Sequence, residues 1–152
     1  MGYEIRIKKL QRQDTAVVHA SCGLEEIGEV LSGIFSEVMA HILASGVQPA
    51  GGAFGRYEPV QAGFRVEAGF TVTAPVVAAG RVEPGELPGG EAATCLHVGP
   101  YEGVAEAYEA VESWMREQGR EASGPAWEVY LTGPEAQPPQ TEVFFPLRSG
   151  QE

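Results

Sequence analysis

Residues 97–104 read HVGPYEGV and lead from an apolar run into a helical pattern. Two strand-like segments follow that pattern, WEVYLTGP at residues 127–134 and TEVFFPL at residues 141–147. Alternation of apolar and other side chains favours strands in both segments, whereas the three-to-four spacing before them favours a helix. The second half of the chain therefore predicts the order strand, helix, strand, strand.

The first half of the chain has the same order. Residues 17–24 (VVHASCGL) lead into a long helical pattern, and residues 53–57 and 66–72 follow as strand-like segments. Three positions match between the halves at similar offsets: His19 and His97 at 78 residues, Tyr57 and Tyr130 at 73, and Glu67 and Glu142 at 75. The similarity predicts two pseudo-repeats, at about 3–83 and 91–147, within a single effector-binding domain of residues 1–152.

These patterns define the expected elements and the fold class. Strands are expected at residues 3–9, 16–20, 48–58, 64–73, 91–98, 126–131 and 142–147, with a further strand at 76–83. Helices are expected from Leu24 to Gly46 and from Tyr101 or Glu102 to Gln118, and a proline- and glycine-rich loop at 84–90. The predicted fold is α+β, with duplicated modules forming a pseudo-twofold antiparallel sheet, two main helices and a central ligand cleft.

Composition excludes several classes of protein. The 152 residues carry a net charge of -11 and no basic run, so direct nucleic-acid binding is not expected. No signal sequence and no apolar stretch of about 18 residues stands out, which predicts a cytoplasmic protein without a membrane partner. Cys22 and Cys95 lack metal-ligand spacing and are expected to be reduced. Neither a metal site nor a cofactor is predicted.

Glu128 is the strongest candidate for a functional side chain. It is the charged residue within the otherwise uncharged segment 126–131, where alternation places Glu128 and Tyr130 on one face and Trp127 on the other. In an apolar aromatic site the pKa of this carboxyl would rise unless a cation or a hydrogen-bond donor met it. Such a site suits a lipophilic cation. The alternative is a glutamate on the exposed face of a half-buried strand.

Further candidates are less specific. Glu67 and Glu142 occupy equivalent strands of the two halves, where each can face either a cleft or solvent. The candidate aromatic residues are Tyr57, Tyr101, Tyr108, Trp114, Trp127 and Tyr130. Most of these rings are expected in the core, but Tyr101 follows a Gly-Pro turn at a helix start, where a phenol can overhang a cleft.

Segments 96–103, 127–135 and 141–147 occur in an order that resembles the GyrI-like small-molecule-binding family, also called the AraC-type or Rob-like bacterial effector-binding domain. The resemblance covers essentially the whole chain. It implies a cleft that receives hydrophobic, often cationic compounds, with a buried glutamate at the position of Glu128 and aromatic residues near Tyr101, Trp127 and Tyr130. Because no helix-turn-helix pattern precedes Tyr3, a stand-alone member is expected.

Three functions are compatible with this resemblance. The sequence favours a binding protein that senses or sequesters lipophilic or cationic small molecules. The second reading is a glutamate-dependent hydrolase of strained electrophiles, such as cyclopropane-bearing genotoxins, with Glu128, Glu67 and Glu142 as catalytic candidates. The third is a gyrase-inhibitor-like module whose protein partner is a regulator or DNA gyrase.

Overall fold

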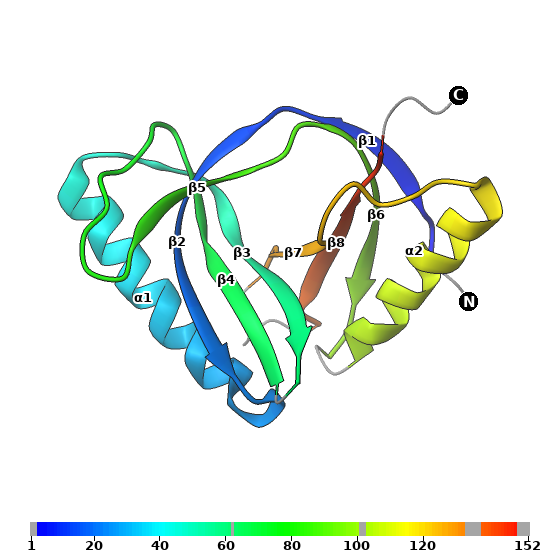
Figure 1. Ribbon diagram of the computed structural model, residues 1–152, viewed down its shortest axis with the longest axis horizontal. Helices are drawn as coiled ribbons and strands as arrows, with labels where there is room; N and C mark the ends of the chain where they lie inside the picture. Colours follow the sequence, from blue (N-terminus) through cyan, green and yellow to red (C-terminus); the bar gives the residue numbers. More distant parts are fainter. Residues whose placement is uncertain (1–2, 62, 101–102, 133–137, 149–152) are drawn as a thin grey trace. The chain divides into compact units, whose positions relative to one another are not determined.

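The computed structural model describes residues 3–61, 63–100, 103–132 and 138–148 (Figure 1). The chain forms two compact units. Residues 12–87 make the first, called here the α1 unit, and residues 1–11 together with 88–152 make the second, the α2 unit. Each unit combines a helix with antiparallel strands, which confirms the α+β class.

The α1 unit has four antiparallel strands in the order β3-β4-β2-β5, which are β3 (Pro49–Val60), β4 (Gly63–Val72), β2 (Gln13–Cys22) and β5 (Glu83–Leu87). A short 3-10 helix, η1 (Leu24–Glu26), leads into α1 (Ile27–Ser45). The buried stripe of α1 is Ile34, Val38 and Ile42, at helical spacing, and it packs on one face of the sheet. Gly46, at φ 78°, ends the helix.

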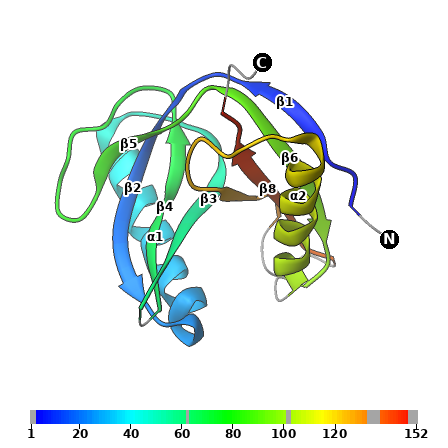
Figure 2. The same cartoon turned by 45° about the vertical axis from the view of Figure 1, so that its right-hand side comes forward.

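The α2 unit has the order β1-β6-β8-β7, with β1 (Arg6–Leu10), β6 (Gly90–Val98), β8 (Gln140–Pro146) and β7 (Trp127–Tyr130). Its helix α2 (Val104–Gln118) lies along β6 and β8 (Figure 2). Ala107, Val111 and Met115 of α2 are buried against a core that includes Val143 and Phe145. Each unit thus consists of a sheet with a helix on one face.

The edge strands β1 and β5 join the sheets in a reciprocal way. β1 precedes β2 in the chain but pairs with β6, where Arg6 lies opposite Thr94. β5 precedes β6 but pairs with β2, where Leu87 lies opposite Gln13. The opening strand therefore completes the sheet of the α2 unit, although the first pseudo-repeat predicted from the sequence includes it. The duplication itself stays a prediction.

The region before β6 differs from the sequence prediction. The strand expected at 76–83 is wrong, because residues 79–82 form only an isolated bridge. The loop expected at 84–90 is also wrong in part, because β5 occupies Glu83–Leu87. Pro84 and Gly85 are turn signals, but β5 is an edge strand of its unit, where proline is tolerated. The opening strand begins at Arg6 instead of residue 3, and Tyr3 and Ile5 pack against the α2-unit core.

Helix α1 is long and apolar enough, with a mean hydropathy of 1.4, to meet a length and composition criterion for crossing a membrane. Core helices of soluble domains meet the same criterion. The contacts of Ile34, Val38 and Ile42 with the buried residues of β2 and β4 indicate a core helix here.

Candidate functional site

Strand β7 places Glu128 on the face of its sheet that α2 covers. Glu128 lies directly opposite Val143 of β8, so the two side chains share a face. Val143 belongs to the core cluster that α2 completes, and Ala126 packs against the same cluster. Glu128 is only 2% exposed, so it is not the solvent-facing glutamate of the alternative interpretation.

Two tyrosine hydroxyls bind the Glu128 carboxylate. Tyr108, on α2, donates to Oε2 at 2.6 Å, and Tyr130, on β7, donates to Oε1 at 2.9 Å. Both tyrosines are only half-buried. The Tyr108 ring also packs edge-on against Phe145, with ring centroids 5.7 Å apart. Because a buried carboxylate is costly without donors, the two phenols make a negative charge tolerable at this position.

The other candidate residues of the α2 unit do not join this group. Trp127 alternates to the opposite face, where it stacks on Phe144 with centroids 5.4 Å apart and an interplanar angle of 6°. Glu142 also lies on that face, and it accepts hydrogen bonds from Lys8 Nζ and Thr94 Oγ1, both at 2.8 Å. Trp114 packs against the α2-unit core. Tyr101 lies outside the described residues.

The remaining candidates belong to the α1 unit. Glu67 accepts two hydrogen bonds from Arg56 and lies 3.9 Å from His19 Nε2. Tyr57 packs against the α1-unit core. Of the nine candidates, the structure therefore joins Glu128, Tyr108 and Tyr130 into one hydrogen-bonded group.

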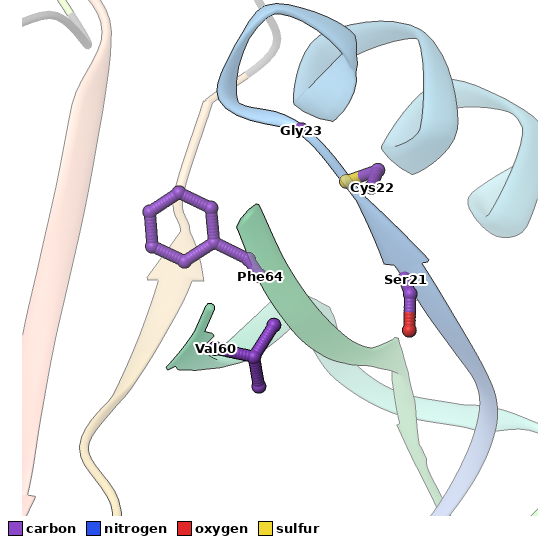
Figure 3. Close-up of a pocket in the computed structure, with 5 residues that line it drawn as sticks. All are labelled: Ser21, Cys22, Gly23, Val60 and Phe64. Carbon is purple, nitrogen blue, oxygen red and sulfur yellow. The ribbon is translucent and has the colours of Figure 1, made fainter. Parts of the chain in front are cut away.

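A shallow hollow in the α1 unit was not singled out by the sequence. It has a volume of about 290 Å³ and is lined by Ser21, Cys22, Gly23, Val60 and Phe64 (Figure 3). No charged side chain lines it, so it offers no group that would orient a charged ligand. The sequence held no signal for this hollow, because its lining residues come from β2, β3 and β4 and carry no distinctive chemistry. We give it less weight than Glu128.

His97 has a structural role in the α2 unit. Its side chain is 6% exposed and lies between Tyr3 and the loop before α2. The Pro100 carbonyl can only accept a hydrogen bond, so His97 Nε2 donates to it at 2.8 Å, and Nδ1 accepts from Tyr3 Oη at 2.9 Å. Among the described residues no group of three or more metal-ligand side chains occurs.

Cys95 is unsuited to act as a nucleophile. It is 3% exposed, and its Sγ lies 3.8 Å from the Ala107 carbonyl. Burial, with a smaller contribution from the negative charge of Glu142, raises the pKa of the Cys95 thiol to about 11. The reactive thiolate is therefore scarce at neutral pH.

This raised pKa gives a test of the fold around Cys95. In a Cys22→Ser variant at pH 8, Cys95 should react with iodoacetamide roughly 100-fold more slowly in the folded protein than in urea, measured by mass spectrometry. Above pH about 8.5 the unfolded chain loses a thiol proton that the folded chain keeps, so this contribution to stability is lost as pH rises toward 11. Equal rates in the folded and unfolded protein would contradict the burial of Cys95.

Comparisons with known proteins agree with this fold. Residues 3–148 match the family described as GyrI-like small molecule binding domain. No curated protein matches the sequence significantly. Among solved structures, EcmrR in a complex with DNA has a TM-score of 0.84 at 21% identity over 97% of this chain, which spans 58% of the EcmrR chain. The separate C-terminal domain of EcmrR has the same TM-score at 18% identity and is covered over its full length, with 99% of this chain aligned.

Two other relatives carry ligand or activity names. SAV2435, solved with bound tetraphenylphosphonium, has a TM-score of 0.64 at 13% identity, with 95% of this chain and 94% of that chain covered. A protein from Listeria innocua described as a hydrolase has a TM-score of 0.71 at 12% identity, with 97% and 93% covered. At such identities the likeness shows a common fold.

Proposed function

This chain belongs to the GyrI-like small-molecule-binding family, and from that premise we propose that it binds lipophilic organic cations through the Glu128 carboxylate. The observation that carries the proposal is the pair of tyrosine hydroxyls that hold this buried carboxylate. A charge removed from water acts on a nearby cation with little screening. Glu128 is therefore the counter-charge, and binding serves sensing or sequestration of the ligand.

The tyrosines also supply the surface on which a ligand packs. A phenol that donates its proton toward a carboxylate has a more electron-rich ring, which strengthens cation–π attraction. Tyr108 and Tyr130 are half-buried, so their rings have one side in contact with the protein and accessible area remaining. A cation with aromatic groups gains both apolar contact and charge attraction from this arrangement.

The comparisons support the ligand class by analogy. SAV2435, which shares the fold, was solved with tetraphenylphosphonium, a lipophilic cation. We extend that ligand class to this chain because the same chemistry, a carboxylate with phenols, is present at Glu128.

The experiment compares tetraphenylphosphonium with the neutral, similarly aromatic triphenylphosphine oxide. At a concentration of 100 times its dissociation constant, the cation should raise the melting temperature by about 5–10 °C, measured by differential scanning fluorimetry. The neutral compound should bind at least about 10-fold more weakly by isothermal titration calorimetry. Binding of the neutral compound with equal or greater affinity would refute the counter-charge.

The other two functions receive no specific support from the described residues. A hydrolase of the expected kind needs a second carboxylate near Glu128, and Glu142 points to the opposite face of the sheet. A protein partner such as a regulator or DNA gyrase, and a cytoplasmic location, stay predictions from the sequence.

A further inference from the structure

A polar site occurs on the face of the α1-unit sheet that α1 does not cover. Ala16 and Val18 of β2 belong to the core beneath α1, so Thr15 and Val17 alternate to the opposite face. Thr15 lies directly opposite Gly85 of β5 and Thr71 of β4. Three different strands thus contribute to this face near Thr15.

An ion pair orients Glu67 on this face. Arg56 of β3 donates through Nε and Nη2 to the same oxygen, Glu67 Oε1, at 2.9 and 2.7 Å. Arg56 Nη2 also reaches the carbonyl of Glu86 in β5, at 3.4 Å. Both partners of the pair are 18% exposed. Arg56 therefore neutralises Glu67 and holds it so that Oε2 faces β5.

Gly85 leaves space between two polar oxygens. A Cβ at Gly85 would lie 2.8 Å from Thr15 Oγ1, 3.4 Å from Glu67 Oε2 and 3.5 Å from Val17 Cγ2. Thr15 Oγ1 and Glu67 Oε2 thus border the position that any side chain other than glycine would fill. The Val17 methyl adds an apolar contact at the same place.

The hydroxyl of Thr15 points to a missing ligand at this position. Thr15 is 0% exposed, and its Oγ1 has no hydrogen-bond partner among the described residues. Buried polar groups in folded proteins are nearly always hydrogen-bonded, and an orphan group lowers stability. A valine would fill the same volume without this cost, so the hydroxyl has a use that packing does not explain.

We propose that Thr15, Glu67 and Gly85 form a binding site for the hydroxyl group of a small organic ligand, separate from the cation site at Glu128. The ligand oxygen accepts a hydrogen bond from the Thr15 hydroxyl and donates one to Glu67 Oε2, while its adjacent carbon contacts Val17. A neutral hydroxyl fits better than a cation, because Arg56 already balances the charge of Glu67. This assignment does not depend on the function proposed for Glu128.

The experiment follows amide shifts in ¹H–¹⁵N spectra during titration with benzyl alcohol, toluene and benzyl methyl ether. Benzyl alcohol should shift the amides of Thr15, Glu67 and Gly85 saturably. Toluene lacks the hydroxyl and the ether lacks its proton, so both should bind at least about 10-fold more weakly. Equal affinities for the three compounds would overturn the proposal.

Two variants and a control locate the binding. Thr15→Val removes the hydroxyl at constant shape, and Gly85→Ala places a methyl group in the ligand position; each should weaken benzyl alcohol at least about 10-fold. Gly124→Ala is the matched control, because nothing lies within 4 Å of its added Cβ, and it should keep wild-type affinity. Thr15→Val should also raise the melting temperature of the free protein.

An ordered water is the competing occupant of this position. If wild-type protein shows no saturable shift at these amides, and a water resonance shows a nuclear Overhauser effect to Thr15, the site holds an ordered water only. That result would overturn the ligand assignment, as would unchanged affinity in Gly85→Ala.

Discussion

Glu128→Gln is expected to weaken tetraphenylphosphonium binding by about 10- to 100-fold while leaving triphenylphosphine oxide binding within about twofold of wild type. Glutamine keeps the shape of the side chain and can still accept from one of the two tyrosines at Glu128. It removes the negative charge. Isothermal titration calorimetry with both compounds measures the difference directly.

Glu142→Gln is the matched control for this experiment. Glu142 lies in the neighbouring strand but on the opposite face, where Lys8 and Thr94 bind it. Its loss of charge should leave cation affinity unchanged. A large loss in Glu142→Gln with no loss in Glu128→Gln would move the cation site to the other face of the sheet. Equal losses for charged and neutral ligands in Glu128→Gln would instead indicate a packing role.

Gly69→Ala is expected to destabilise the protein by about 3 kcal/mol or more, which lowers the melting temperature by roughly 6–12 °C. Gly69 is buried in β4 and pairs with Val17 on one side and Phe54 on the other. A Cβ added there would lie 1.9 Å from the Ala16 carbonyl oxygen. Because the obstacle is backbone, relief requires β2 and β4 to move apart, with loss of ladder hydrogen bonds.

Thermal unfolding followed by circular dichroism tests this expectation. Gly124→Ala again provides the control, and its stability should stay within about 0.5 kcal/mol of wild type. A Gly69→Ala protein that melts within about 2 °C of wild type would show that β2 and β4 are further apart than described.

Local patterns predicted both helices and most strands correctly. The spacing of Ile34, Val38 and Ile42 in α1, and of Ala107, Val111 and Met115 in α2, depends only on neighbouring turns, so it is readable in the sequence. β5 was missed because Pro84 and Gly85 are turn signals, and only its pairing with β2 makes it a strand. Likewise, the pairing of β1 with β6 depends on residues far apart in the chain.

The candidate site was predictable in part. A charge isolated in an apolar strand marked Glu128, and alternation placed Tyr130 on the same face. The sequence could not show that Tyr108 reaches Glu128 from α2, because that contact depends on how the helix crosses the sheet. The Thr15 site was missed because threonine is ordinary in strands. Its signal was Gly85, since a glycine within a strand marks a close approach of other atoms.

The pairing of β1 with β6 has a consequence for synthesis of the chain on the ribosome. The α1 unit is contiguous, so it can fold once Leu87 has emerged. β1 is made earlier but pairs only when Thr94, 88 residues after Arg6, becomes available. At about 5–20 residues per second, this strand waits several seconds with its edges uncovered. The charges of Arg6, Lys8 and Lys9 help to keep it from pairing with other chains during that interval.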